Sequence, residues 1–84
     1  MNVNDLTSRI REILKDHGRL SQDAVSIQDT TDLYQAGMTS HASVNVMLAL
    51  EGAFDVEFPD QMLTRNVFNS VASIRAALEQ LIPA

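Results

Sequence analysis

Ser40 and His41 stand together where an irregular polar segment gives way to an apolar run, and both side chains can take part in chemistry. A serine at the start of a helix can cap it by accepting a hydrogen bond from a free backbone N–H, or it can present its hydroxyl for covalent modification. Thr39 could act as the cap and leave the Ser40 hydroxyl available. Spacing alone does not choose between these two roles for Ser40.

His41 has three possible roles: an exposed polar residue, a contact for a bound group or a partner protein, or an acid/base group. Catalysis would need a nucleophile and an orienting partner nearby, and the sequence gives no such set. We expect exposure or partner contact for His41 and assign no catalytic residue. In the preceding turn, we expect Gly37 to supply a positive φ or a close backbone approach, and Met38 to plug the core or its rim.

The composition narrows the classes of function. The chain has 84 residues, which predicts a single domain over residues 1–84. It has no cysteine, which excludes a thiolate nucleophile, a disulfide or a cysteine-based zinc site, so any thiol would have to arrive on a cofactor. Its 11 acidic and 6 basic residues give a net charge of −5, which argues against nucleic-acid binding and favours a basic protein partner.

The beginning of the sequence, Met1 to Asp5, lacks the basic and then apolar regions of a signal peptide. No apolar run approaches the roughly 18 residues that a membrane span needs. We therefore expect a cytoplasmic protein that does not bind a membrane. We also expect a monomer.

The elements that must position Ser40 begin with a first helix, predicted from Asn4 to about His17 with Asn4 as its N-cap. Gly18 is expected to end this helix in a left-handed conformation. The apolar residues that define its buried face are Leu6, Ile10, Ile13 and Leu14.

The segment from Gly18 to Thr39 has no helical periodicity and predicts a long loop. Its acidic cluster over residues 29–32 lacks the alternation, the glycine and the closing glutamate of a calcium loop, so we expect solvated turn carboxylates and no metal site. The residues expected to anchor the loop in the core are Ile27, Leu33 and Tyr34, with one helical turn near Asp32 to Gln35.

The second helix is predicted from about Ser40 to Gly52 or Ala53. Apolar residues on several of its sides predict a largely buried helix, whereas its polar or small first turn, residues 40–43, is expected to be exposed. That end carries unpaired N–H groups and the positive end of the helix dipole, which suits a phosphate ester attached near it.

The rest of the chain predicts a connector and one more long helix. Residues 54–60 alternate apolar and acidic side chains, so we expect an extended connector that buries Phe54, Val56 and Phe58. A short turn or helix is expected over Asp60 to about Thr64. The last helix follows an N-cap at Ser70, stops at Pro83, and has Val71, Ile74, Leu78 and Leu81 on one face. The predicted fold is all-α, a small four-helix bundle with three main helices, one short helix and a long loop after the first.

These motifs together resemble a carrier protein of the acyl carrier and peptidyl carrier family. The likeness covers nearly the whole chain, and its strongest element is the fixed interval between Ser40, the Leu50-Glu51 pair and the Phe-Asp-x-Glu-x-Pro segment over residues 54–59. The matching residues run from Asp32-Leu33 through Gly37 and Ser40 to the helical stretch Val44–Glu51 and the segment Phe54–Asp60.

The resemblance implies that Ser40 is the attachment site for 4′-phosphopantetheine, transferred from coenzyme A by a magnesium-dependent phosphopantetheinyl transferase. The terminal thiol of this arm would hold a cargo as a thioester, which fits a chain without cysteine. The protein would not be an enzyme; an acyl- or amino acid-activating ligase would load it, and a downstream acceptor enzyme would take the cargo. The flanking cofactor-binding residues would be Gly37, Met38, Thr39 and His41, and the partner-binding residues His41, Val44, Asn45, Glu51, Asp55 and Glu57.

Two departures separate this chain from fatty-acid-type carriers. Those carriers usually have Asp-Ser-Leu at the attachment site, where this chain has Thr39-Ser40-His41. They also line the second helix with acids, whereas the corresponding outward positions here hold Ala42, Asn45 and Gly52. Docking by fatty-acid synthase enzymes through a basic patch should therefore be weaker near Ser40.

Gly-Met-Thr-Ser followed by a bulky residue instead resembles the small stand-alone aminoacyl carrier proteins. Those carriers are charged by truncated relatives of seryl-tRNA synthetase, which activate an amino acid with ATP. We favour this class. Two alternatives stay open: an acyl carrier of a specialised fatty-acid or polyketide-type pathway and, from another class, an unmodified helical interaction module in which Ser40 is only a cap.

Overall fold

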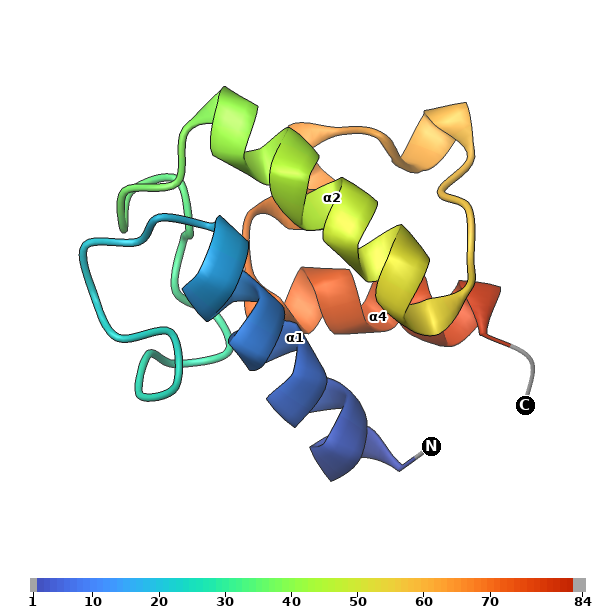
Figure 1. Ribbon diagram of the computed structural model, residues 1–84, viewed down its shortest axis with the longest axis horizontal. Helices are drawn as coiled ribbons and strands as arrows, with labels where there is room; N and C mark the ends of the chain where they lie inside the picture. The colour runs from blue at the N-terminus through green and yellow to red at the C-terminus, as the bar shows by residue number, and fades with distance from the viewer. Residues whose placement is uncertain (1, 83–84) are drawn as a thin grey trace.

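A computed structural model describes residues 2–82 of the chain. In these residues it has four α-helices, one 3-10 helix and no strand, so the all-α prediction is confirmed. The long helix α1 packs against both α2 and α4, and the short α3 packs against α4 (Figure 1). The elements in order are α1 (Val3–His17), α2 (Ser40–Phe54), η1 (Asp60–Met62), α3 (Arg65–Phe68) and α4 (Val71–Leu81).

The core lies between the three long helices, where their apolar faces meet. The spacing that predicted the buried faces of α1 and α4 is confirmed. In α2 the buried side chains are Ala42, Val46 and Leu50, whereas the spacing of Val44, Met47, Leu48 and Glu51 predicted a different face. Burial of such side chains is the main source of stability in a domain of this size. The fully buried side chains are Ile10, Leu14, Leu33, Val46, Leu50, Val71, Ile74 and Leu78.

The two ends of α1 differ from their prediction. Its N-cap is Asn2, whose side chain accepts a hydrogen bond from the N–H of Asp5 at 2.8 Å, so the choice of Asn4 was wrong by two residues. Gly18 does not adopt the left-handed conformation: its φ is −78° and its N–H donates to the Leu14 carbonyl. A Cβ at Gly18 would lie 2.8 Å from the Leu14 oxygen, so the position needs a glycine for space, and Arg19 takes the positive φ of 53°.

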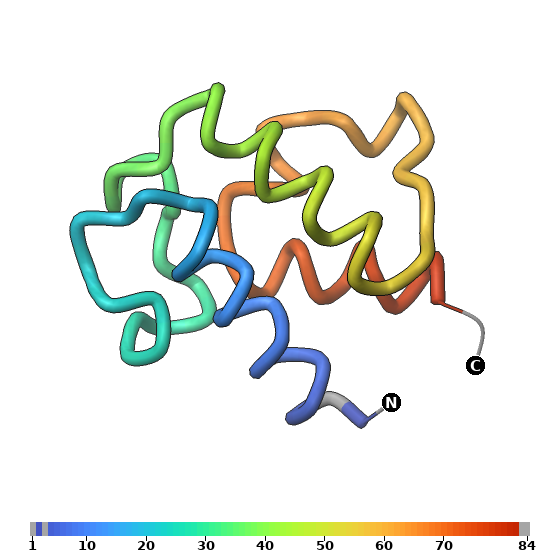
Figure 2. The backbone as a smooth tube through the Cα atoms, viewed as in Figure 1, coloured from blue at the N-terminus to red at the C-terminus, as the bar shows by residue number. Residues whose placement is uncertain are grey.

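The loop between α1 and α2 forms its own lobe beside the C-terminal end of α1 (Figure 2). As predicted, Ile27 and Leu33 are buried, while Tyr34 is half-buried. The expected turn at residues 32–35 is present, with the Asp32 carboxylate accepting from the Tyr34 N–H at 2.9 Å.

Asp29 is more than the solvated turn carboxylate that was predicted: its side chain is 41% exposed but is also ion-paired. Its side chain forms ion pairs with Arg11 of α1 and with Arg75 of α4. Arg11 also donates to the carbonyl oxygens of Ala24 and Ile27, at 3.0 and 2.6 Å. These contacts tie the loop to both helices and explain how a segment without helices or strands keeps a defined course.

α2 is less buried than its composition predicted. Ala42, expected to be exposed in the first turn, is buried because it faces the core. Val44 and Leu48, one helical turn apart, are instead exposed to 49% and 55%. The helix also extends past Ala53 to Phe54, where Asp55 closes it with a left-handed φ of 53°.

The connector after α2 buries Phe58 as predicted, but Phe54 and Val56 are only half-buried. The Glu51 carboxylate accepts a hydrogen bond from the Phe58 N–H at 2.9 Å and so turns the connector back toward α2. The guanidinium of Arg9 lies 4.5 Å from the centre of the Phe54 ring and covers it.

The predicted short element over residues 60–64 is a single 3-10 turn, η1, and the short α-helix α3 begins after two intervening residues, at Arg65. Ser70 and Ser73 form a capping box at the start of α4, which confirms Ser70 as the N-cap. Pro83, predicted to stop this helix, lies outside the described residues. Within the described part of the chain, no helix combines the length and the apolarity needed to cross a membrane.

Candidate functional site

The turn that leads to Ser40 depends on Gly37. Its φ is +114°, a backbone conformation that residues other than glycine rarely adopt. The predicted positive φ is therefore confirmed. A Cβ at Gly37 would also lie 3.0 Å from the backbone nitrogen of Ser21. Ser21 fixes the turn from the other side, since its N–H and its hydroxyl both donate to the Ala36 carbonyl, at 2.7 and 2.8 Å.

Met38 supports this turn from beneath. Its side chain is only 2% exposed and belongs to the core, and its N–H donates to the Leu33 carbonyl at 3.0 Å. Met38 is therefore a core residue, which confirms that it plugs the core. Its contact with a cofactor stays a prediction.

Thr39 and Ser40 divide the two roles that the sequence left open for a serine. The Thr39 hydroxyl oxygen accepts a hydrogen bond from the Ala42 N–H at 3.0 Å, so Thr39 is the N-cap of α2. Ser40 is the first residue of the helix and is exposed. Its carbonyl accepts from the Ser43 hydroxyl at 2.7 Å, whereas no hydrogen bond within residues 2–82 engages its own hydroxyl. The Ser40 hydroxyl is thus left to react.

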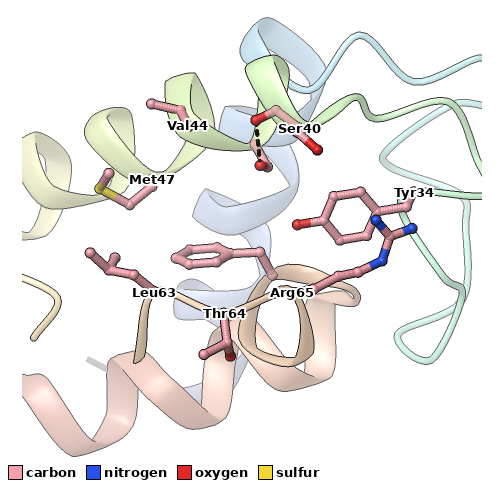
Figure 3. Close-up of a pocket in the computed structure, with 9 residues that line it drawn as sticks. Tyr34, Ser40, Val44, Met47, Leu63, Thr64 and Arg65 are labelled. Atoms are coloured by element: carbon pink, nitrogen blue, oxygen red, sulfur yellow. Dashed lines mark hydrogen bonds between the residues drawn. The ribbon is translucent and has the colours of Figure 1, made fainter. Parts of the chain in front are cut away.

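A groove of about 330 Å³ begins at Ser40 and passes between α2 and the segment that contains α3 (Figure 3). Most of its wall is apolar, from both sides. α2 contributes Val44 and Met47 to this wall, and the opposite side contributes Leu63 and Phe68. The other lining residues are Tyr34, Ser43, Thr64 and Arg65.

Tyr34 and Arg65 form the polar end of this groove. The Arg65 guanidinium carbon lies 4.0 Å from the centre of the Tyr34 ring, a cation–π contact between the long loop and α3. In Figure 3 the ring lies between Ser40 and the guanidinium, and its hydroxyl points into the groove. The sequence predicted neither residue as part of the site, because the two are brought together only by the fold.

His41 is exposed on the first turn of α2 and is not among the residues that line the groove. Within the described residues it forms no ion pair, and no set of three His, Cys, Asp or Glu side chains is placed to hold a metal ion. Its contact with a partner stays a prediction.

The predicted partner-binding residues of α2 and the connector differ in exposure. Val44, Asp55 and Glu57 are exposed, and Asn45 is half-buried. Glu51 is half-buried and its carboxylate is already engaged with the Phe58 N–H, so it has a structural role of its own. The contact of these residues with a partner remains a prediction.

The site as a whole suits a phosphopantetheine arm. An exposed serine hydroxyl stands at the positive end of a 15-residue helix, where a phosphate ester is stabilised. Beside it runs an apolar groove that ends at a tyrosine and an arginine. The apolar wall suits the dimethyl part of such an arm, the tyrosine hydroxyl suits its amides, and the arginine suits its phosphodiester. When bound, the arm supplies the thiol that the chain lacks.

Known proteins with similar sequences are carriers. Residues 4–78 match the family described as the phosphopantetheine attachment site. The chain is 43% identical to the aminoacyl carrier protein of Agrobacterium fabrum over 77 residues, which cover 92% of this chain and 93% of that protein. It is 36% identical to aminoacyl carrier protein 1 of Bradyrhizobium diazoefficiens over 83 residues, covering 95% and 90%.

Solved structures with a similar fold also include carrier proteins. The carrier protein from Agrobacterium tumefaciens, in a crystal with an engineered Bradyrhizobium japonicum glycine:[carrier protein] ligase and ATP, matches with a TM-score of 0.86 and 44% identity over 89% of this chain and 97% of that one. A chain in the structure of Bradyrhizobium japonicum glycine:[carrier protein] ligase complexed with glycylated carrier protein matches with a TM-score of 0.70 and 28% identity. The match covers 87% of this chain and 97% of that one.

The family match spans most of the chain and includes Ser40, and both named relatives exceed 30% identity over nearly their full lengths. This favours the predicted carrier over an unmodified interaction module. Carriers of this family are not themselves catalysts, and their cofactor is 4′-phosphopantetheine. From its fold, its exposed serine and these matches, we conclude that this chain belongs to the phosphopantetheine-attachment family of carrier proteins.

Proposed function

We propose that this protein is an aminoacyl carrier: Ser40 bears 4′-phosphopantetheine, and the terminal thiol of the arm holds an amino acid as a thioester. The observation that carries the assignment of Ser40 is the division of roles at the start of α2, where Thr39 makes the capping hydrogen bond and Ser40 keeps an exposed hydroxyl. The aminoacyl cargo is supported by the two relatives named aminoacyl carrier proteins.

Three partners follow from this function. A phosphopantetheinyl transferase attaches the arm, an amino acid:[carrier protein] ligase loads it, and an acceptor enzyme takes the amino acid. The ligase is supported by the solved complexes of similar carriers with glycine:[carrier protein] ligase. Attachment and loading use coenzyme A and ATP, so we propose that the carrier acts in the cytoplasm. We also propose that it acts as a monomer.

Intact-protein mass spectrometry tests the attachment site. The wild type, Ser40→Ala and Ser43→Ala are incubated with coenzyme A, magnesium and a broad-specificity transferase. Ser43 is a matched control, because it lies about one helical turn from Ser40 and lines the same groove. Its hydroxyl donates a hydrogen bond to the Ser40 carbonyl. We expect the wild type and Ser43→Ala to gain one phosphopantetheine group and Ser40→Ala to gain none. Uptake by Ser40→Ala would show that the site is elsewhere.

Loading of the modified protein tests the cargo. The arm-bearing protein is incubated with ATP and a glycine:[carrier protein] ligase, first with glycine and then with other amino acids. We expect a mass gain of one aminoacyl group that hydroxylamine removes, since hydroxylamine cleaves thioesters. Loading by a fatty acyl ligase and by no amino acid ligase would instead identify an acyl carrier.

A further inference from the structure

Arg65 is the basic residue whose charge the described fold leaves unneutralised beside the attachment site. Of the six basic residues of the chain, Arg11 and Arg75 pair with Asp29, and Arg9 covers Phe54 and donates to the Ala53 carbonyl. Lys15 and Arg19 do not line the groove. Within residues 2–82 no carboxylate pairs with Arg65, although the chain carries an excess of acids.

Tyr34 holds this charge in place. The guanidinium lies 4.0 Å from the ring centre, while the side chain as a whole is exposed, so its donors remain accessible. Stacking on an aromatic face restrains an arginine without using its N–H groups, which can still bind an anion. Ser40 and Arg65 flank the same ring and line the same groove.

The chemistry of the proposed arm leaves one group for this cation to bind. The phosphodiester is the anionic group of the arm, and it is attached directly to Ser40. In an aminoacyl thioester the carboxyl group of the amino acid is bonded to sulfur and carries no charge. The amino group remains a free ammonium, which Arg65 would repel. The guanidinium therefore suits the root of the arm, next to Ser40, and does not suit its loaded end.

We propose that Arg65, held by Tyr34, binds the phosphodiester on Ser40 and directs the arm into the apolar groove. This inference rests on the proposed function. The contact orders the root of the arm in the unbound carrier, so an enzyme meets an arm that leaves the helix in a preferred direction.

Phosphorus NMR of the arm-bearing protein tests this contact directly. The phosphodiester resonance is recorded for the wild type, Arg65→Gln, Arg65→Lys and Arg9→Gln, and for the wild type unfolded in urea, which gives the position of an unrestrained diester. Arg9→Gln is the matched control, since it removes an equal charge from the other cation–π pair, at the opposite end of α2.

We expect the wild type and Arg9→Gln to share one resonance position. Arg65→Gln should move more than about half of the way to the unfolded reference, and Arg65→Lys less far, because lysine keeps the charge but loses the planar stack. The wild-type resonance should also move toward the reference at about 1 M salt, because interactions between exposed charges more than about 3 Å apart are then largely screened. Circular dichroism confirms that each variant is folded.

The outcomes separate the two proposals. Mass spectrometry of the same samples shows whether each variant took up the arm. Failure of the wild type to take it up would overturn both the proposed function and this inference. Complete uptake with one resonance position for the wild type and Arg65→Gln, or an equal displacement in Arg9→Gln, would overturn the role of Arg65 alone.

Discussion

Asp29 is the residue that holds the long loop against the rest of the protein. Its carboxylate pairs with Arg11 and Arg75, and its carbonyl accepts from the Ala72 N–H at 2.9 Å. The hydrogen bond from Arg75 contributes most to lowering the pKa of this carboxyl below its usual value; partial burial opposes it, and the bond from Arg11 adds to it. The charged form of Asp29 therefore favours the folded state.

Asp29→Asn should reduce the free energy of unfolding by about 0.5–1 kcal/mol at neutral pH, since it removes the charge from two hydrogen bonds to arginine, and solvent screens this side chain, which is 41% exposed. Because the folded pKa is lowered, this contribution is fully present above the unfolded value, near pH 4, and is lost as the pH falls through the folded value. Urea titrations of both proteins between pH 7 and pH 3 should therefore converge in the acid. Asp16→Asn, at an exposed carboxylate of α1, is the control. A gap that stayed constant with pH would contradict the role given to the charge.

The residues of the site that could be predicted were those with local causes. The cap at Thr39 and the positive φ of Gly37 follow from neighbours along the chain. The attachment role of Ser40 came instead from the family resemblance, because its position suited a helix cap equally well. The roles of Asp29 and of the Tyr34–Arg65 pair depend on partners far away in the sequence, such as Arg75, 46 residues after Asp29. No local pattern carries that information.

Gly18 and Gly52 differ in whether the structure leaves room for a side chain. Gly18 ends α1 where a Cβ would meet the Leu14 carbonyl oxygen at 2.8 Å. Gly52 lies inside α2, and a Cβ there would meet nothing within 4 Å. A glycine within a helix costs more conformational entropy than an alanine, so Gly52 lowers stability without a packing reason.

Gly52→Ala should stabilise the protein by about 0.5–1 kcal/mol. Gly18→Ala should destabilise it by about 1–3 kcal/mol, because the backbone of α1 must shift to relieve the contact. Thermal unfolding followed by circular dichroism compares the two with the wild type. If both substitutions changed the stability by the same amount in the same direction, the space around each glycine would not determine the effect of adding a Cβ.

At the level of elements, periodicity predicted α1 and α4 because each has an apolar face to bury, whereas α2 was predicted from its apolar composition. It missed α3, which at four residues is too short for a periodic pattern. It also overstated the burial of α2, since composition does not tell which of several apolar sides faces the core. The exposed side of α2 is where Val44 and Leu48 lie.

The whole molecule depends on one small core. Leu50 and Ile74 are completely buried in it. Leu50→Ala or Ile74→Ala should cost roughly 2–5 kcal/mol through lost burial and the cavity left behind, which can approach the total stability of so small a domain.

Leu48→Ala is the matched control for these core substitutions. It removes the same side chain as Leu50→Ala from the same helix, but at a position exposed to 55%, so its effect should stay within about 0.5 kcal/mol. Urea titration at equilibrium measures all three variants. Similar losses for Leu48→Ala and Leu50→Ala would mean that burial does not set the cost.

The position of Tyr34 turns the protein into its own optical sensor. The chain has one tyrosine and no tryptophan, so its emission arises at a single ring when the exciting light is of a wavelength that its three phenylalanines do not absorb. That ring lines the groove beside Ser40 and carries the Arg65 guanidinium on its face. Any group that enters the groove, or that draws the guanidinium away, changes the surroundings of the sole fluorophore. The state of the carrier can therefore be followed in real time, without a label, by the intensity of its intrinsic light.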